Sequence, residues 1–152
     1  ESATLDVYGP FFDGLDESLF QPGARAEYKG LLDPGEVIDT LRKYDAVILP
    51  SKARSEGYPG VILEAYSIGL PVIASAVGGI PEIVDDRCGI LIEPGDEEAL
   101  LSAMRRLVSD NAAYRRLCKG AREARERYSS EYWVGWMVQA CIQLSKRTLP
   151  AS

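Results

Sequence analysis

The chain has no histidine and few cysteines. None of its 152 residues is histidine, which excludes imidazole catalysis and metal sites that depend on histidine ligands. The cysteines are Cys88, Cys118 and Cys141, an odd number without the spacing of a metal-binding motif. The sequence therefore offers neither a histidine-based active site nor a recognisable metal centre.

Long apolar runs and an excess of positive charge are also lacking. Each apolar run is soon interrupted by a charged residue, glycine or proline, so we expect no secretory signal and no membrane span, and a soluble, cytoplasmic protein. A formal net charge of -6 at pH 7 argues against general binding to nucleic acid or anionic lipid, and we expect no nucleic-acid partner. The length is that of one domain with a substantial core.

Short apolar, β-branched runs alternate with helix-like segments, which is typical of a mostly parallel sheet flanked by helices. We therefore predict an α/β fold. The segments AVIL and PVIA lack polar alternation, as expected for strands that are buried on both faces. The predicted strands are 4–8, 26–29, 46–49, 72–74 and 89–92.

Helical patterns fill most of the remaining chain. In DPGEVIDTLRKY, Asp33 is expected to cap a helix, with Pro34 at its first position and Glu36 completing a capping box. Acidic and basic residues alternate over 111–127, which indicates a solvated outer face. Apolar residues recur at helical spacing over 132–146, which indicates packing into the core. Two further helices are predicted at 60–68 and from residue 96 onward.

The loop between the third predicted strand and the following helix is the first candidate site. In an open parallel sheet, ligands bind beyond the carboxyl ends of the strands. Gly57 and Gly60 allow the backbone of this loop to approach a ligand closely. The amides of Gly60, Val61 and Ile62 are expected to point outward from a helix N-terminus, which is a suitable seat for a phosphate.

Two glutamates accompany this loop at a fixed spacing. Glu56 precedes the helix and Glu64 lies inside it, in the frame EGYPGVILEAYSIGLPV. Taken alone, a glutamate on a helix is usually a surface residue, and a Gly-Pro loop is usually only a turn. Here they are followed closely by AVGGIPEIV, where Gly78 and Gly79 precede another helix start, and then by GILIEPGD. The combination is far more specific than any of its parts.

This arrangement resembles the C-terminal, donor-binding domain of GT-B glycosyltransferases of the retaining family-four type, the glycosyl transferases group 1. The matching motifs are the E-x7-E pair with its Gly-Pro loop, LPVIAS, GGIPEIV and CGILIEPGDEEAL, with YKG and YDAVILPS before them. The resemblance covers nearly the whole chain. It implies a Rossmann-like fold, with residues 1–148 forming a partial nucleotide-sugar-binding domain and 149–152 a tail.

The resemblance also implies roles for individual residues. Glu56 would be the catalytic residue and would contact the hydroxyls of the donor sugar, and Glu64 would accept hydrogen bonds from the ribose hydroxyls. The Val61 and Ile62 amides would bind the distal phosphate. No metal or other cofactor is implied beyond the nucleoside-diphosphate sugar as co-substrate. The implied donor-binding residues are Glu56, Gly57, Tyr58, Pro59, Gly60, Val61, Ile62 and Glu64.

Two features depart from the family pattern. The loop before Glu56 is longer than the common form and contains Lys52 and Arg54, which are either phosphate contacts or, as we favour, solvated charges. The segment TLDVYG corresponds to the family's second strand, so we expect this domain's central first strand and the acceptor-binding N-terminal domain to lie upstream.

That second departure implies several expectations about partners. The fragment alone should be inactive, and its open sheet should close the gap or borrow a strand, giving a dimer caused by truncation. The acceptor, a sugar or a lipid-linked glycan, would bind through the N-terminal domain. Any peripheral contact with the inner membrane would also be made by that domain.

Four alternatives compete with a glycosyltransferase. A retaining glycosidase would need Glu56 and Glu64 to face one glycosidic bond at about 5 Å, which a loop and a helix position suit poorly. A nucleotide-sugar epimerase is a closer rival, although such enzymes use histidines that are absent here. A non-catalytic nucleotide-sugar-binding module is also compatible with the motifs. A dinucleotide oxidoreductase is disfavoured, because VYGPFFDG stands where G-x-G-x-x-G would follow the first strand.

Overall fold

The computed structural model of the chain describes residues 3–11, 16–20 and 25–148, with side chains up to residue 145. All five predicted strands are present within these residues, each within one residue of its predicted bounds. They are β1 (Leu5–Tyr8), β2 (Ala26–Gly30), β3 (Val47–Leu49), β4 (Val72–Ser75) and β5 (Gly89–Ile92). Every strand pair is parallel, which confirms the predicted Rossmann-like α/β architecture. The predicted tail, 149–152, lies outside the described residues.

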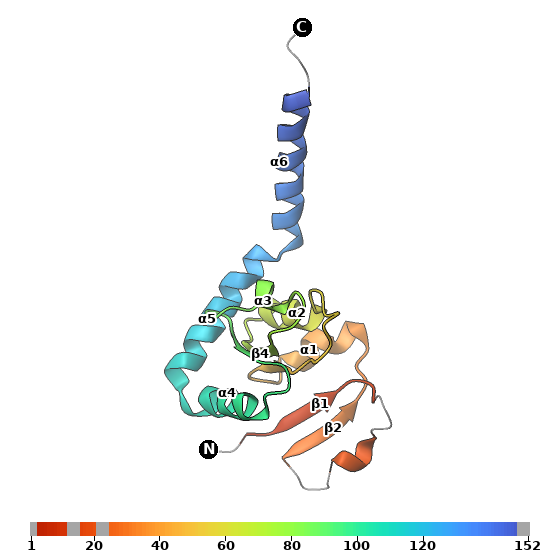
Figure 1. Ribbon diagram of the computed structural model, residues 1–152, viewed down its shortest axis with the longest axis vertical. Coiled ribbons are helices and arrows are strands. Elements are labelled where there is room, and N and C mark those ends of the chain that lie inside the picture. Colours follow the sequence, from red (N-terminus) through yellow and green to blue (C-terminus); the bar gives the residue numbers. More distant parts are fainter. Residues whose placement is uncertain (1–2, 12–15, 21–24, 149–152) are drawn as a thin grey trace.

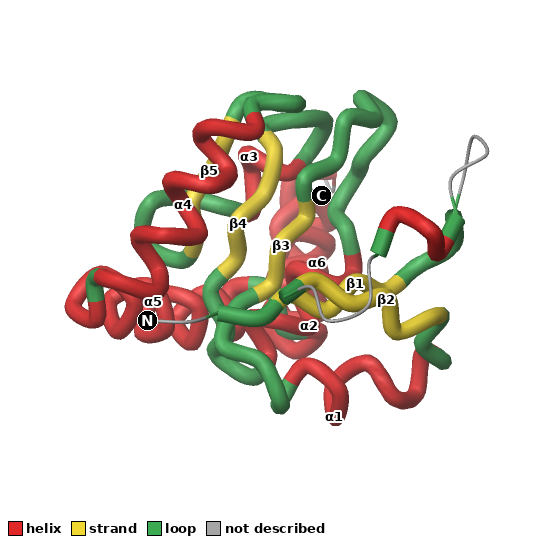
Figure 2. Tube along the Cα trace, turned by 90° about the horizontal axis from the view of Figure 1, so that it is seen from below, coloured by secondary structure: helices red, strands yellow, loops and turns green. Residues whose placement is uncertain are grey.

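The strands form two separate sheets. One has the order β1-β2 and the other the order β3-β4-β5. Figure 2 shows β5, β4 and β3 side by side, with β1 and β2 beyond β3. No ladder joins β1 to β3 in the described chain, so the gap anticipated from the sequence is not closed. The Tyr44 hydroxyl, shortly before β3, reaches Asp6 Oδ2 on β1 at 2.6 Å.

The described chain contains six α-helices, of which α6 extends away from the strands (Figure 1). A short 3₁₀ turn (Pro34–Glu36) leads into α1, but the Asp33 side chain forms no capping hydrogen bond, so that part of the prediction is wrong. Asp96 does cap α4, by accepting a hydrogen bond from the Ala99 amide at 2.8 Å. The helices are α1 (Val37–Leu41), α2 (Gly60–Ser67), α3 (Ile80–Ile83), α4 (Glu97–Ser109), α5 (Asn111–Arg127) and α6 (Ser130–Thr148).

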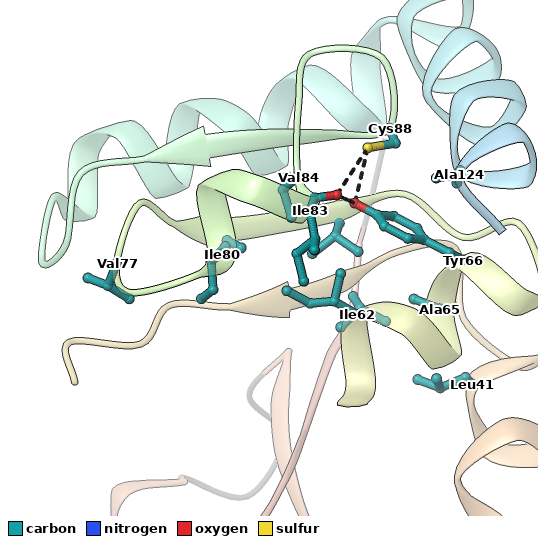
Figure 3. Packing of buried hydrophobic residues seen from close by; sticks show 14 residues of the cluster. Leu41, Ile62, Ala65, Tyr66, Val77, Ile80, Ile83, Val84, Cys88 and Ala124 are labelled. Carbon is teal, nitrogen blue, oxygen red and sulfur yellow. Dashed lines mark hydrogen bonds between the residues drawn. The ribbon is translucent and has the colours of Figure 1, made fainter. Parts of the chain in front are cut away.

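The three-stranded sheet is covered on both faces, and β4 is buried along its whole length. Val72 and Ala74 point into a cluster shared with α2 and α5, whereas Ile73 points into a second cluster under α4. This alternation follows from the two-residue period of a strand. Figure 3 shows the first cluster, in which the fully buried Tyr66 donates a hydrogen bond to the Ile83 carbonyl at 3.0 Å.

Helix α5 is charged on one side only. Its opposite side is buried in the protein through small and apolar residues such as Leu117, Ala121 and Ala124. A Cβ atom on Gly120 would lie 1.9 Å from the Arg87 carbonyl oxygen, so glycine lets the helix press against the turn before β5. The prediction of a solvated face is therefore correct for the charged residues but misses this packing side.

Helix α6 contradicts its prediction. It extends away from the body of the molecule (Figure 1), and large apolar side chains remain exposed along it. Trp133, Trp136 and Met137 are 47%, 57% and 59% exposed, so the apolar spacing of this segment does not reflect core packing within this chain. In the described residues, no helix combines the length and the apolar character needed to cross a membrane.

Candidate functional site at the carboxyl edge of the sheet

Three loops meet at the carboxyl edge of the three-stranded sheet. They follow β3, β4 and β5, and they lie at the same edge because the strands are parallel. A Cβ atom on Gly79 would lie 2.7 Å from the Gly57 carbonyl oxygen, so the first two loops are in backbone contact. The Lys52 Cε atom lies 3.5 Å from the position that a Cβ atom on Gly95 would take, so the third loop also contacts the first.

Glu56 is anchored at this junction. The Ser51 hydroxyl donates a hydrogen bond to Glu56 Oε1, and the Gly79 amide donates to the Glu56 carbonyl at 2.9 Å. The Glu56 side chain is half-buried. Backbone and side chain are thus both held by neighbouring loops, while the second carboxylate oxygen has no hydrogen-bond partner in the described chain. This arrangement suits a carboxylate that must accept hydrogen bonds from a ligand.

Glu64 lies one turn inside α2 and is also half-buried. Its carboxylate forms no hydrogen bond or ion pair among the described residues. Because residues three and four apart share a helix face, Glu64 lies on the side of α2 that carries Gly60 and Val61. The amides of Gly60 and Val61 have no acceptor in the described part of the chain. The Ile62 amide, by contrast, donates to the Pro59 carbonyl at 3.1 Å.

Lys52 and Arg54 are exposed in the loop after β3, and neither forms an ion pair within the described chain. Their positions leave both side chains free to move toward an anion or to stay in solvent. The backbone of Arg54 contributes to the loop contact instead, since its carbonyl oxygen would lie 3.2 Å from a Cβ atom on Gly78.

The structure adds site residues that the sequence interpretation did not select. Ser51 positions Glu56, and Glu82 of α3 accepts a hydrogen bond from the Tyr58 hydroxyl. That hydrogen bond to the Glu82 carboxylate raises the pKa of Tyr58 above its ordinary value. The signal for both residues was their place in quoted motifs, Glu82 in GGIPEIV and Ser51 at the end of YDAVILPS.

A buried polar atom lies at the end of β4. Ser75 is fully buried, and its Oγ has no hydrogen-bond partner among the described residues. The described chain also contains no group of three or more acidic or cysteine side chains placed to hold a metal ion. The polar groups at this edge are therefore carboxylates, helix-terminal amides and exposed cations, a set that matches a polar, anionic organic ligand.

The parallel strands and flanking helices define a Rossmann-like α/β domain. The model of the family described as "Glycosyl transferases group 1" matches residues 2–110, and the chain belongs to this family.

The comparisons also give individual relatives. The chain is 36% identical over 124 residues to sulfoquinovosyl transferase from Arabidopsis thaliana, an alignment covering 79% of this chain and 24% of that protein. Sucrose-phosphate synthase from Thermosynechococcus elongatus superposes with a TM-score of 0.69 and 32% identity, over 83% of this chain and 32% of that chain. Anabaena HepE in complex with UDP-glucose gives a TM-score of 0.66 and 25% identity, over 82% and 33%. The chain thus spans about a quarter to a third of the length of these proteins.

Proposed function

We propose that this chain is the donor-binding domain of a retaining glycosyltransferase, which transfers a sugar from a nucleoside-diphosphate sugar to a glycan, a lipid-linked acceptor or another acceptor. The observation that carries the proposal is the anchoring of Glu56 at the carboxyl edge, next to a helix start whose first amides are unpaired. Family membership and the UDP-glucose bound by Anabaena HepE support it.

The two glutamates are assigned to opposite ends of one donor molecule. Glu56 would contact the sugar hydroxyls and Glu64 the ribose hydroxyls, because an ionised carboxylate accepts two hydrogen bonds from a vicinal diol. Gly57 and Gly60 would leave room for the sugar and diphosphate between them. The free amides of Gly60 and Val61 would bind the distal phosphate, with a smaller contribution from the Ile62 amide because Pro59 already accepts from it.

The chemistry would need no metal ion. As the sugar leaves, negative charge develops on the nucleoside diphosphate, and helix-terminal amides stabilise such charge in a site shielded from water. Lys52 and Arg54 are exposed and unpaired in the described chain, so they could add positive charge only by moving toward the diphosphate. We propose that this chain alone binds donor without transferring it, because transfer requires donor and acceptor to be held together.

Localisation and acceptor choice form part of the same proposal. The enzyme would be cytoplasmic, with peripheral membrane contact. Its acceptor would bind to the portion of the longer protein that this chain does not span. The comparisons do not favour an epimerase or a non-catalytic module.

Calorimetric titration tests the donor assignment. We expect the chain to bind UDP, with GDP and ADP as comparisons that identify the base. Glu64→Gln should weaken UDP and UDP-glucose alike, by about tenfold, because the ribose is common to both. Glu56→Gln should weaken UDP-glucose and leave UDP unchanged, since only the sugar contact is lost.

The matched control is Glu126→Gln, an exposed carboxylate on α5. Absence of binding for all three nucleotides would reject the proposal, as would equal effects of the Glu64 and Glu126 variants. Retention itself would be read from the anomeric proton of the product made by the longer protein.

A further inference from the structure

A hollow lies away from the carboxyl edge, along the outer side of β5. It has a volume of about 430 Å³ and is bounded by β5, α4 and α5. A smaller hollow of about 250 Å³ adjoins it and shares its two arginines. We call the larger one the β5 groove and define it by Asp86, Gly89, Ile90, Leu91, Arg106 and Arg116. None of these residues has a role in the proposed donor site.

The floor of the β5 groove is an open strand edge. Among the strands of the described residues, β5 is the last of its sheet and has β4 on one side only. The Cys88 carbonyl accepts a hydrogen bond from the Val72 amide of β4 at 3.4 Å. The Ile92 carbonyl accepts one from the Ala76 amide, just after β4, at 2.8 Å. Backbone groups of successive residues in a strand point to opposite sides, so the Leu91 N–H and C=O point into the groove. Such an edge is a template for one more strand.

Two unpaired arginines form the walls of the β5 groove. Arg106 follows the buried Ala103 of α4 by one turn. Arg116 precedes Gly120, the glycine of α5 that touches the turn before β5, also by one turn. Neither guanidinium forms an ion pair or hydrogen bond within the described chain, although each has five N–H donors. The groove thus combines an open strand edge with two free cations.

We propose that the β5 groove binds an extended, acidic polypeptide segment as an added strand beside β5. The backbone of the segment would pair with Leu91, and its carboxylates would meet Arg106 and Arg116. This mode of recognition takes affinity from backbone hydrogen bonds and selectivity from alternate side chains. Opposite charge across such a contact favours encounter and fixes the register.

The lining of the groove favours a polypeptide over a small anion. An open strand edge presents donors and acceptors in alternation, which a peptide backbone matches and a phosphate does not. Asp86 also lines the groove and would repel a compact polyanion, whereas a peptide can place an N–H or a neutral side chain there.

Fluorescence anisotropy tests this proposal with the labelled, end-blocked peptide GEVEVEG. We expect saturable binding that the reversed-charge peptide GKVKVKG does not show. Two further probes carry N-methyl groups on alternate residues, one on each edge of the peptide. Only one of them should lose affinity, because only one edge faces β5. The double variant Arg106→Gln, Arg116→Gln should lose about tenfold in affinity.

The matched control is Arg105→Gln with Arg115→Gln. These residues are the neighbours of the groove arginines on the same helices, are exposed, and do not line the groove. Both double variants change the net charge equally, so an equal loss in both would overturn the proposal. Absence of binding up to roughly millimolar peptide would overturn it too. So would binding of inorganic phosphate or phosphatidylglycerol vesicles in place of the peptide.

Discussion

A Cβ atom on Gly78 would lie 1.9 Å from the carbonyl oxygen of Glu56. Gly78 also has φ +53, a left-handed conformation that side chains disfavour. Because of these two constraints, the loop after β4 supports the loop that carries Glu56 through direct backbone contact. The position of the candidate catalytic carboxylate therefore depends on a glycine that does not carry chemistry itself.

Gly78→Ala should displace the Glu56 loop. We expect a loss of roughly 1–3 kcal/mol in the free energy of unfolding, from backbone strain and the contact with the Glu56 carbonyl, together with weaker UDP-glucose binding. Urea denaturation and calorimetry would measure both effects. Gly35→Ala is the control, because Gly35 has no neighbour within 4 Å of its Cβ position. An unchanged urea midpoint for Gly78→Ala would contradict this account of the loop.

Tyr66→Phe should remove a buried hydrogen-bond donor. The Ile83 carbonyl would lose the hydroxyl that now lies 3.0 Å away and keep only the weak Cys88 thiol donor at 3.8 Å, so we expect a cost of about 1–3 kcal/mol. Tyr128→Phe loses an exposed hydrogen bond to the Glu82 carbonyl and should cost about 0.5 kcal/mol or less. Thermal unfolding of both variants would compare them directly, and equal costs would show that burial of the Tyr66 hydroxyl is unimportant.

The ionisation of Asp85 should make the stability of the folded state depend on pH. Its hydrogen bond to Arg87 lowers the pKa of the carboxyl from 3.8 to about 2. A depressed pKa means that the ionised group stabilises the folded state above about pH 4 and that this contribution is lost as the pH falls toward 2. The Arg87 pair is largely exposed, so solvent screening limits the effect to about 0.5 kcal/mol.

Asp85→Asn should therefore lower stability at pH 6, with a deficit that shrinks below pH 4. Urea unfolding over that range would measure it. Asp86→Asn is the neighbouring control, since the Asp86 side chain makes no hydrogen bond in the described chain. A deficit that grows toward low pH would show that the sign of the linkage is wrong.

Removing α6 should leave the α/β body intact. Its apolar side chains are exposed, so a chain ending at Ser129 should unfold within about 0.5 kcal/mol of the full chain. A chain ending at Asp110 also lacks α5 and its buried Leu117, Ala121 and Ala124, and should lose cooperative unfolding. Circular dichroism melts would measure both shortened chains. A large loss on removing α6 alone would mean that the helix packs onto the body in solution.

The unpaired edges of β1 and β3 should pair between two copies of the chain. Exposed strand edges are templates for association, and these two edges belong to sheets that share no ladder in the described chain. We expect a concentration-dependent dimer by light scattering after size exclusion. It should persist in the chain ending at Ser129, which separates strand pairing from contacts between the exposed aromatic side chains of α6. A monomer at every concentration would refute this expectation.

The sequence by itself determined the order and bounds of the strands, the α5 boundaries and the loops at the carboxyl edge, because these depend on local periodicity and on glycine and proline positions. It also indicated the family through the combination of the Glu56–Glu64 pair with the motifs around it. Burial is not local, and so the exposure of Trp133 on α6 and the full burial of Tyr66 were decided only by tertiary packing. The same holds for the contact of Gly78 with Glu56 and for the division into two sheets. Each depends on which backbone segments come into contact in the folded chain, and the periodicity within a single segment does not predict such contacts.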